Sequence, residues 1–112
     1  MILYVDVDET ICSYPKERDY PLAEPISENI DKINQLYDEG HTIVYWTARG
    51  STTGIDWTEL TVMQLKQWGA KFNRVQLGKP HFDLYICDKS INSKRFFDNQ
   101  GDEHGEMLSN RP

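Results

Sequence analysis

Cysteine is scarce in this chain, which has only Cys12 and Cys87 among its 112 residues. One disulfide is arithmetically possible, but two cysteines cannot build the disulfide framework of a small secreted domain. The first residues also lack the basic stretch and the following apolar run of a signal peptide. We therefore expect reduced thiols and a cytoplasmic location, with Cys87 as a small core residue inside an apolar run.

Long hydrophobic runs and an excess of basic residues are also lacking. No apolar stretch approaches the roughly 20 residues needed to span a bilayer, so we expect no membrane segment. The 12 lysines and arginines are outnumbered by 18 aspartates and glutamates, which gives a net charge of -6. This balance argues against a nucleic-acid binder that relies on basic surface. It does not exclude a small phosphorylated substrate, because a metal ion can reverse the local field of an acidic site.

What remains is the composition of one small globular domain. Apolar residues make up 38% of the chain and aromatic residues 12%, and 112 residues suffice for one modest core but not for two. We expect a single domain over residues 1–98. The polar tail over residues 99–112 is rich in glycine, asparagine and charge, so its order is doubtful.

Short apolar segments alternate with amphipathic ones along the chain. Four of them predict buried β-strands, at residues 2–7, 42–47, 74–77 and 84–87. One helix is predicted from an N-cap at Ser27 to Gly40, a second from the capping-box-like residues 56–59 to Gly69, and a last turn or two at residues 91–97. Residues 12–25 contain three prolines and predict a loop or flap. The alternation predicts an α/β fold with three layers, α/β/α, around a Rossmann-like parallel sheet.

Polar side chains follow three of the predicted strands. Because the carboxyl ends of parallel strands meet at one edge, where such folds bind ligands, we expect these side chains to converge. They are Asp6 and Asp8 after the first strand, Thr47 and Arg49 after the second, Lys79 in the loop before the fourth, and Asp88 after the fourth.

Acids combined with a lysine and a hydroxyl suit a phosphate group held with a metal cation. An anionic phosphate monoester repels a carboxylate nucleophile unless a cation compensates, and magnesium prefers one or two carboxylates plus waters and substrate. An ammonium and a hydroxyl can hold the remaining phosphoryl oxygens. A second carboxylic acid can protonate the leaving alkoxide and later activate water. An aspartyl-phosphate intermediate would split the displacement into two steps.

Residues 6–10, Asp-Val-Asp-Glu-Thr, resemble the first motif of the haloacid dehalogenase superfamily, Asp-x-Asp-x-Thr. The second motif is matched by Thr47 after an apolar strand, and the third by Lys79 in Gly-Lys-Pro. The fourth is matched by Asp88 with Asn92 four residues later. The four motifs occur in the family's order and span most of the chain. The resemblance implies the superfamily's fold without a cap domain, because neither segment that could carry a cap is long enough.

The resemblance also implies catalytic roles. Asp6 is expected to be the nucleophile and Asp8 the general acid and base. Thr47 and the backbone amide of Ala48 are expected to bind the phosphoryl group together with Asp8. Lys79 is expected to offset the charge of the phosphate and the nucleophile. A second aspartate at this spacing favours a phosphatase over a dehalogenase, because a halide leaving group needs no proton.

The implied magnesium ligands are Asp6, the backbone carbonyl of Asp8, and Asp88. Asn92 is implied to support these ligands without touching the metal itself. Asp83 competes with Asp88 for the metal role. Asp83 begins the predicted strand and Asp88 ends it, so Asp88 is better placed.

Several neighbouring positions stay open. Arg49 is expected either to grip a substrate anion or to be a surface charge. Glu9 stands where the family pattern often has glycine, and its purpose is not assigned. Tyr14 and Glu9 could shape the substrate entrance, and His81 could line the site or be structural.

Residues 45–50 and 54–58, with residues 78–80 and 86–89, resemble a subgroup of small bacterial proteins associated with capsule or surface-polysaccharide biosynthesis. This implies a phosphorylated sugar or polyol as the substrate. Two alternatives are kept: a phosphoprotein phosphatase, suggested by Asp-x-Asp-Glu-Thr and an open site, and a catalytically silent binding module on the same fold. An open site is also compatible with a homo-oligomer in which a neighbouring subunit covers it.

Overall fold

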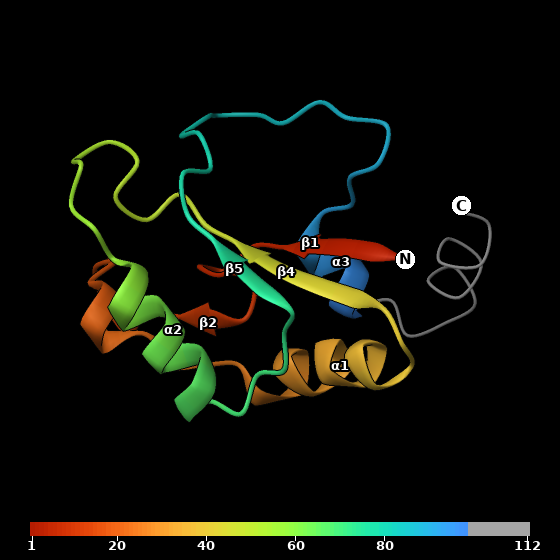
Figure 1. Ribbon diagram of the computed structural model, residues 1–112. Coiled ribbons are helices and arrows are strands. Elements are labelled where there is room, and N and C mark those ends of the chain that lie inside the picture. The colour runs from red at the N-terminus through yellow and green to blue at the C-terminus, as the bar shows by residue number, and fades with distance from the viewer. Residues whose placement is uncertain (99–112) are drawn as a thin grey trace.

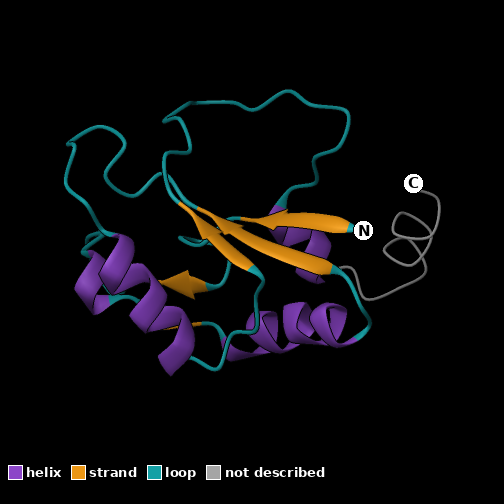
Figure 2. Cartoon of the chain, in the orientation of Figure 1, coloured by secondary structure: helices purple, strands orange, loops and turns teal. Residues whose placement is uncertain are grey.

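A computed structural model describes residues 1–98, and the tail predicted over residues 99–112 lies outside the described part. Figure 1 labels the elements along the chain, and Figure 2 colours them by type. They are β1 (Ile2–Val5), β2 (Cys12–Ser13), a 3-10 turn η1 (Tyr20–Leu22), β3 (Glu24–Pro25), α1 (Ser27–Asp38), β4 (Thr42–Trp46), α2 (Thr58–Gln67), β5 (Arg74–Gln76) and α3 (Ser93–Asp98).

Three strands form the central sheet, in the order β1-β4-β5, and both pairings are parallel. Val5 lies beside Tyr45, and Tyr45 lies beside Val75. This register brings the carboxyl ends of the three strands to one edge, so the residues that follow β1 and β4 leave the sheet side by side. The predicted α/β class with a parallel sheet is confirmed.

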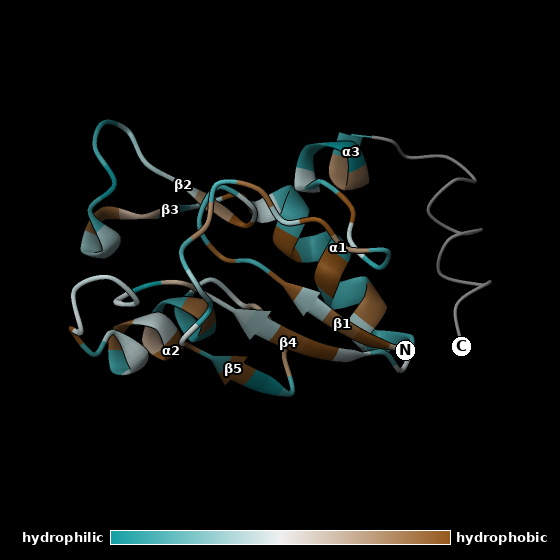
Figure 3. Ribbon diagram, turned by 90° about the horizontal axis from the view of Figure 1, so that it is seen from above, coloured by the Kyte–Doolittle hydropathy of each residue, from teal (hydrophilic) through white to brown (hydrophobic). Residues whose placement is uncertain are grey.

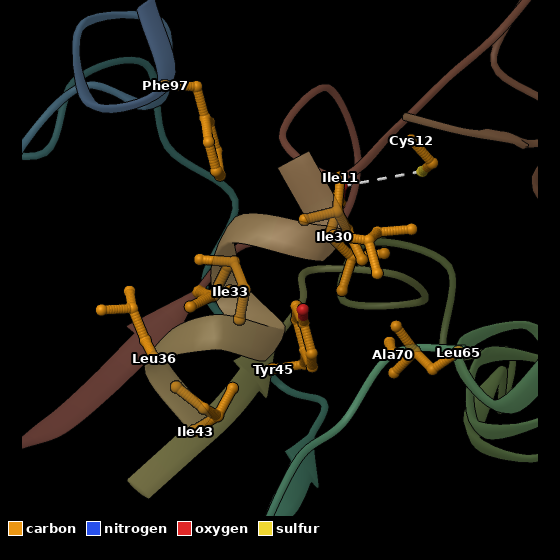
Figure 4. Close-up of a cluster of buried hydrophobic side chains, with 12 residues drawn as sticks. Ile11, Cys12, Ile30, Ile33, Leu36, Ile43, Tyr45, Leu65, Ala70 and Phe97 are labelled. Atoms are coloured by element: carbon orange, nitrogen blue, oxygen red, sulfur yellow. Dashed lines mark hydrogen bonds between the residues drawn. The ribbon is translucent and has the colours of Figure 1, made fainter. Parts of the chain in front are cut away.

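The core lies between one face of the sheet and α1. Ile30, Ile33 and Leu36 recur at helical spacing and are buried, so one stripe of α1 faces the sheet. Figure 4 shows this stripe directed toward Ile43 and Tyr45 of β4. Side chains from α2 and α3 complete the same cluster, Leu65 and Phe97 among them.

Residues 12–25 form more than a loop. Cys12 pairs with Pro25 and Ser13 with Glu24, which makes a short antiparallel ribbon of β2 and β3. Figure 3 shows this ribbon beside the main sheet, with the chain between its strands extending away from the body. The predicted flap is therefore tied down at its base.

Both long helices begin slightly differently from the prediction. Ser27 is the first residue of α1 rather than its N-cap, which is Ile26. Asp56 lies before α2 and accepts a hydrogen bond from the Thr58 N–H at 3.0 Å. An aspartate oxygen thus satisfies one of the free amides at the helix start, as expected of a capping residue.

The predicted fourth strand is wrong in the described structure. Residues 84–87 form no strand and belong to the long loop over residues 77–92, which passes over the face of the sheet opposite α1 and α2 (Figures 1 and 2). Leu84 is 75% exposed and Ile86 is 87% exposed. Cys87 is half-buried and lies outside the core, contrary to expectation. A four-residue apolar run signals burial but does not specify the partner that buries it.

Alanine substitutions at two isoleucines distinguish this loop from a buried strand. Ile86→Ala is expected to change the free energy of unfolding by no more than about 0.5 kcal/mol, because the side chain is exposed. Ile43→Ala is expected to cost about 2–5 kcal/mol, because Ile43 is fully buried in β4. Urea denaturation followed by circular dichroism measures both. A cost at Ile86 equal to that at Ile43 would contradict the loop.

Candidate active site

Asp6 directly follows β1 at the carboxyl edge of the sheet. Its side chain is 41% exposed, and its Oδ1 lies 3.7 Å from the Nζ of Lys79. Partial burial raises the pKa of Asp6, while the charge of Lys79 opposes that rise. The structure therefore brings together the predicted nucleophile and the predicted lysine, from opposite ends of the described chain.

Lys79 is held by its surroundings on several sides. Its side chain is only 16% exposed, and its ammonium lies 5.3 Å from the Trp46 ring centroid and 5.4 Å from that of Phe82. Its backbone N–H donates to the Thr47 carbonyl at 3.1 Å, and its carbonyl accepts from the Ser51 hydroxyl at 2.6 Å. These contacts fix a flexible side chain beside Asp6.

Thr47 lies at the end of β4 and is buried. Its N–H donates to the Gln76 carbonyl at 3.0 Å, which extends the pairing of β4 with β5. Its Oγ1 accepts the Arg49 N–H at 3.1 Å, so the hydroxyl proton is left for another acceptor. Ala48 follows and is half-buried. Thr47 and Ala48 thus lie at the same edge as Asp6, as predicted.

Asp8 is buried and is bound by Arg49. The guanidinium binds both carboxylate oxygens, with Nη2 at 2.9 Å from Oδ1 and Nε at 3.2 Å from Oδ2. The Tyr14 hydroxyl also donates to Oδ1. Burial would raise the pKa of Asp8, but the hydrogen bonds from Arg49 and Tyr14 outweigh it and hold the pKa below its usual range. Asp8 is therefore kept ionised and oriented.

Arg49 is neither of the things expected from the sequence. Its side chain is fully buried, so it is not a surface charge, and its guanidinium is used inside the protein rather than by a substrate anion. While Nε and Nη2 bind Asp8, Nη1 donates to the Thr61 hydroxyl at 3.1 Å and to the side-chain Oε1 of Gln64 at 2.7 Å. The guanidinium also lies 4.7 Å from the Tyr20 ring centroid.

These contacts explain why the buried side of α2 is polar. Thr61 and Gln64 are buried, whereas the apolar Met63 is 48% exposed. Sequence reasoning missed Thr61 and Gln64 because it took apolar residues as the mark of the buried side. The sequence did hold one signal for a polar buried side: Thr61 and Gln64 are three residues apart, so they share a face of the helix with the apolar Leu65.

Glu9 has a backbone role. It adopts φ 60°, in the left-handed region that a non-glycine residue seldom occupies. The turn around it is closed by bonds from the Thr10 and Ile11 N–H groups to the Val7 carbonyl. The left-handed conformation accounts for the glycine often found at this place in the resembled motif.

Among residues 1–98, Asp88 joins no cluster of three possible metal ligands. It is exposed in the loop over residues 77–92, and the Cys87 thiol donates to its Oδ1 at 3.8 Å. Asp83 and His81 are exposed in the same loop. The structure thus gathers the residues of the first three predicted motifs but not that of the fourth.

Asn92 caps a helix in the structure. Its Oδ1 accepts the Lys94 N–H at 2.9 Å, and its carbonyl accepts the Phe96 N–H at 3.0 Å. These bonds satisfy amides at the start of α3 that have no partner within the helix. The metal-related role predicted for Asn92 stays a prediction.

The described side chains do not form a ready-made metal cluster. Across residues 1–98, no three histidine, cysteine, aspartate or glutamate side chains lie close enough together to hold a metal ion. Asp6 offers one accessible carboxylate, the carboxylate of Asp8 is bound by Arg49, and Asp88 is in the loop. Magnesium usually takes only one or two protein carboxylates and completes its shell with waters and substrate, so Asp6 stays a candidate ligand.

The ionised state of Asp8 predicts a pH dependence of stability. Its pKa is lower in the folded protein than in the unfolded chain, where it is about 3.9. The stabilising contribution is therefore present above about pH 4 and is lost as the pH falls through the folded value. Between about pH 5 and 2, the unchanged protein should lose stability more steeply than Asp8→Asn, measured by urea denaturation. Parallel curves would contradict the Asp8 assignment.

Comparison with known proteins supports the fold and goes no further. No protein-family model matches the chain, and no curated protein matches it. A crystal structure of a structural genomics target from Vibrio cholerae is similar, with a TM-score of 0.79 and 23% sequence identity over 96% of each chain. At this identity the likeness shows the fold alone. None of the helices described over residues 1–98 is long and apolar enough to cross a membrane.

Proposed function

We propose that this protein is a magnesium-dependent phosphomonoester hydrolase that works through an aspartyl-phosphate on Asp6. The observation that carries the proposal is the accessible Asp6 carboxylate 3.7 Å from the Lys79 ammonium, at the carboxyl edge of a parallel sheet. The proposed substrate is a small phosphorylated metabolite, a sugar or polyol phosphate, and the proposed location is the cytoplasm. Free Cys12 and Cys87 are compatible with that location.

In the first step an Asp6 carboxylate oxygen forms a bond to phosphorus while the bond to the ester oxygen breaks. Lys79 compensates the charge that the phosphate brings to the carboxylate. The Thr47 hydroxyl and the Ala48 amide lie at the same edge and are suited to donate to phosphoryl oxygens. The leaving oxygen takes a proton from an acid or, when it is a weak base, departs as the anion.

The described state of Asp8 suits the second step better than the first. An aspartate whose pKa is lowered by Arg49 and Tyr14 is ionised, so it is a poor proton donor and can serve as a base. As a base it accepts a proton from the water that attacks the aspartyl-phosphate, which releases inorganic phosphate and restores Asp6. Substrates with good leaving groups should therefore be hydrolysed most readily.

Magnesium dependence enters the proposal from the sequence motifs, since the described side chains do not assemble a site. For Asp88 to contribute a ligand, the loop over residues 77–92 would have to bring it to Asp6. A homo-oligomer with a neighbouring subunit over the open site is part of the same proposal, and sedimentation of the full chain tests it.

The test is hydrolysis of a generic aryl phosphate by the purified full chain across a magnesium titration. We expect turnover that rises with magnesium and is lost with a chelator. Turnover that is insensitive to the chelator would overturn the magnesium requirement. A chain inactive on aryl, sugar and polyol phosphates with any divalent cation would instead be a binding module, and preference for phosphopeptides would overturn the substrate class.

A further inference from the structure

Two pairs of aromatic side chains flank Lys79, the partner of Asp6, on the face of the sheet opposite α1. We call them the aromatic cluster: Tyr4 of β1, Trp46 of β4, and Phe82 and Tyr85 of the loop over residues 77–92. Tyr4 and Trp46 meet edge to face at 5.6 Å, and Phe82 and Tyr85 lie 5.5 Å apart. The Lys79 ammonium joins the two pairs through its contacts with Trp46 and Phe82.

This cluster does not belong to the hydrophobic core. Tyr4 and Tyr85 are each 51% exposed, and Phe82 is 41% exposed. The residues of the core cluster lie on the other face of the sheet, toward α1. Tyr4 lies two residues before Asp6, near the carboxyl end of β1. Large aromatic surface is thus left in solvent beside the proposed nucleophile.

Exposed aromatic rings next to a charged pair suit a ligand that is anionic at one end and has an apolar ring face at the other. The ammonium of Lys79 attracts the phosphate, and the rings of Trp46 and Phe82 lie immediately around that ammonium. An acyclic polyol has no flat face to place against them.

We propose that the aromatic cluster binds the leaving group and selects phosphomonoesters that carry a ring with an apolar face over acyclic polyol phosphates. The ring can be a six-membered sugar or a nucleobase, since both present such a face. This inference rests on the proposed function for the position of the phosphate. It removes acyclic polyol phosphates from the proposed substrate class and adds nucleotides to it.

Binding to Asp6→Asn tests this without turnover. The full-length variant is titrated by calorimetry with a hexose phosphate, a nucleoside monophosphate, glycerol phosphate and inorganic phosphate. We expect at least one ring-bearing ligand to bind about tenfold more tightly than glycerol phosphate, a difference typical of stacking on an aromatic side chain. Which ligand gains identifies the ring. Equal affinity for cyclic and acyclic ligands would overturn the inference.

Phe82→Leu and Trp46→Leu, each combined with Asp6→Asn, separate ring binding from the simpler role of holding Lys79. Ring binding predicts loss of the tenfold preference with the affinity for inorganic phosphate retained. Equal loss for every phosphate ligand would mean that the rings only position Lys79, and would overturn the inference. Tyr37→Leu, on α1 against the core, is the matched control and should keep the preference.

These outcomes are distinguishable from failure of the proposed function. Ring preference in Asp6→Asn, with no hydrolysis by the unchanged protein, would support the binding site and reject the hydrolase. Hydrolysis of aryl phosphate without any ring preference would support the hydrolase and reject the aromatic site. No binding of any phosphate ligand would reject both.

Discussion

Replacing Arg49 with methionine is expected to lower the free energy of unfolding by about 3–5 kcal/mol, measured by urea denaturation at neutral pH. The substitution keeps an unbranched apolar side chain in the buried space but removes the charge that Asp8 faces. Asp8 is only 8% exposed, so its carboxylate would remain in a poorly solvated site without a counter-charge. Thr61 and Gln64 would each lose the hydrogen bond that Arg49 donates as well.

A surface ion pair of similar length provides the matched control. Lys71 Nζ lies 2.8 Å from Asp38 Oδ1, close to the 2.9 Å of the buried pair, but both side chains are about half exposed. Lys71→Met is therefore expected to change stability by no more than about 1 kcal/mol. Equal effects of Lys71→Met and Arg49→Met would contradict the buried pair.

A double substitution checks the mechanism of the Arg49 effect. If most of the cost comes from the stranded Asp8 charge, Asp8→Asn combined with Arg49→Met should cost clearly less than the sum of the two single changes. Additive costs would mean that Arg49 stabilises the protein mainly through Thr61, Gln64 and the Tyr20 ring.

Asp6→Asn is expected to lower kcat on an aryl phosphate by about 10,000-fold or more, the scale seen when a nucleophile is removed from a hydrolase. The asparagine side chain has nearly the same size but a neutral amide, which does not attack phosphorus as a carboxylate does. Initial rates at saturating substrate measure the loss. Mass spectrometry of acid-quenched unchanged protein should show one added phosphoryl group, which Asp6→Asn should lack.

Asp38→Asn is the control for this experiment. It removes one exposed carboxylate at the end of α1, next to the start of β4 and not to the strand ends that carry Asp6 and Thr47. It should leave kcat unchanged within about twofold. Full activity in Asp6→Asn would contradict the nucleophile assignment. Asp88→Asn then reports on the fourth motif: a large loss of activity would show that Asp88 reaches the site during turnover.

Much of the fold could be predicted from the residues because it depends on local patterns. The β-branched runs at residues 2–7 and 42–47 predict the two strands, and the stripe of Ile30, Ile33 and Leu36 specifies the face of α1. β4 is buried as predicted, whereas Ile2 and Tyr4 of β1 are exposed. Parallel pairing follows from the helix between the two strands. The approach of Lys79 to Asp6 was expected from its place in the loop before the predicted fourth strand.

The network around Asp8 could not be predicted in the same way. Hydrophobic pattern treats Thr61 and Gln64 as surface residues, and only the position of Arg49 in three dimensions shows what they bind. The prediction for the loop over residues 77–92 was wrong for the opposite reason, because its apolar residues were assigned to a buried strand. In both places burial is set by a partner distant in sequence.

The order in which the site can assemble follows from how far apart its parts lie. The Tyr4 hydroxyl bonds to Gln76 across 72 positions, and the pair of Asp6 and Lys79 joins the same two distant parts of the chain. Closing so long a span is slow, because the entropy cost of closing the chain comes before the last strand forms its stabilising contacts. During synthesis, the residues of α1 leave the ribosome well before Lys79 does. Until residue 79 has been made, Asp6 has no lysine beside it.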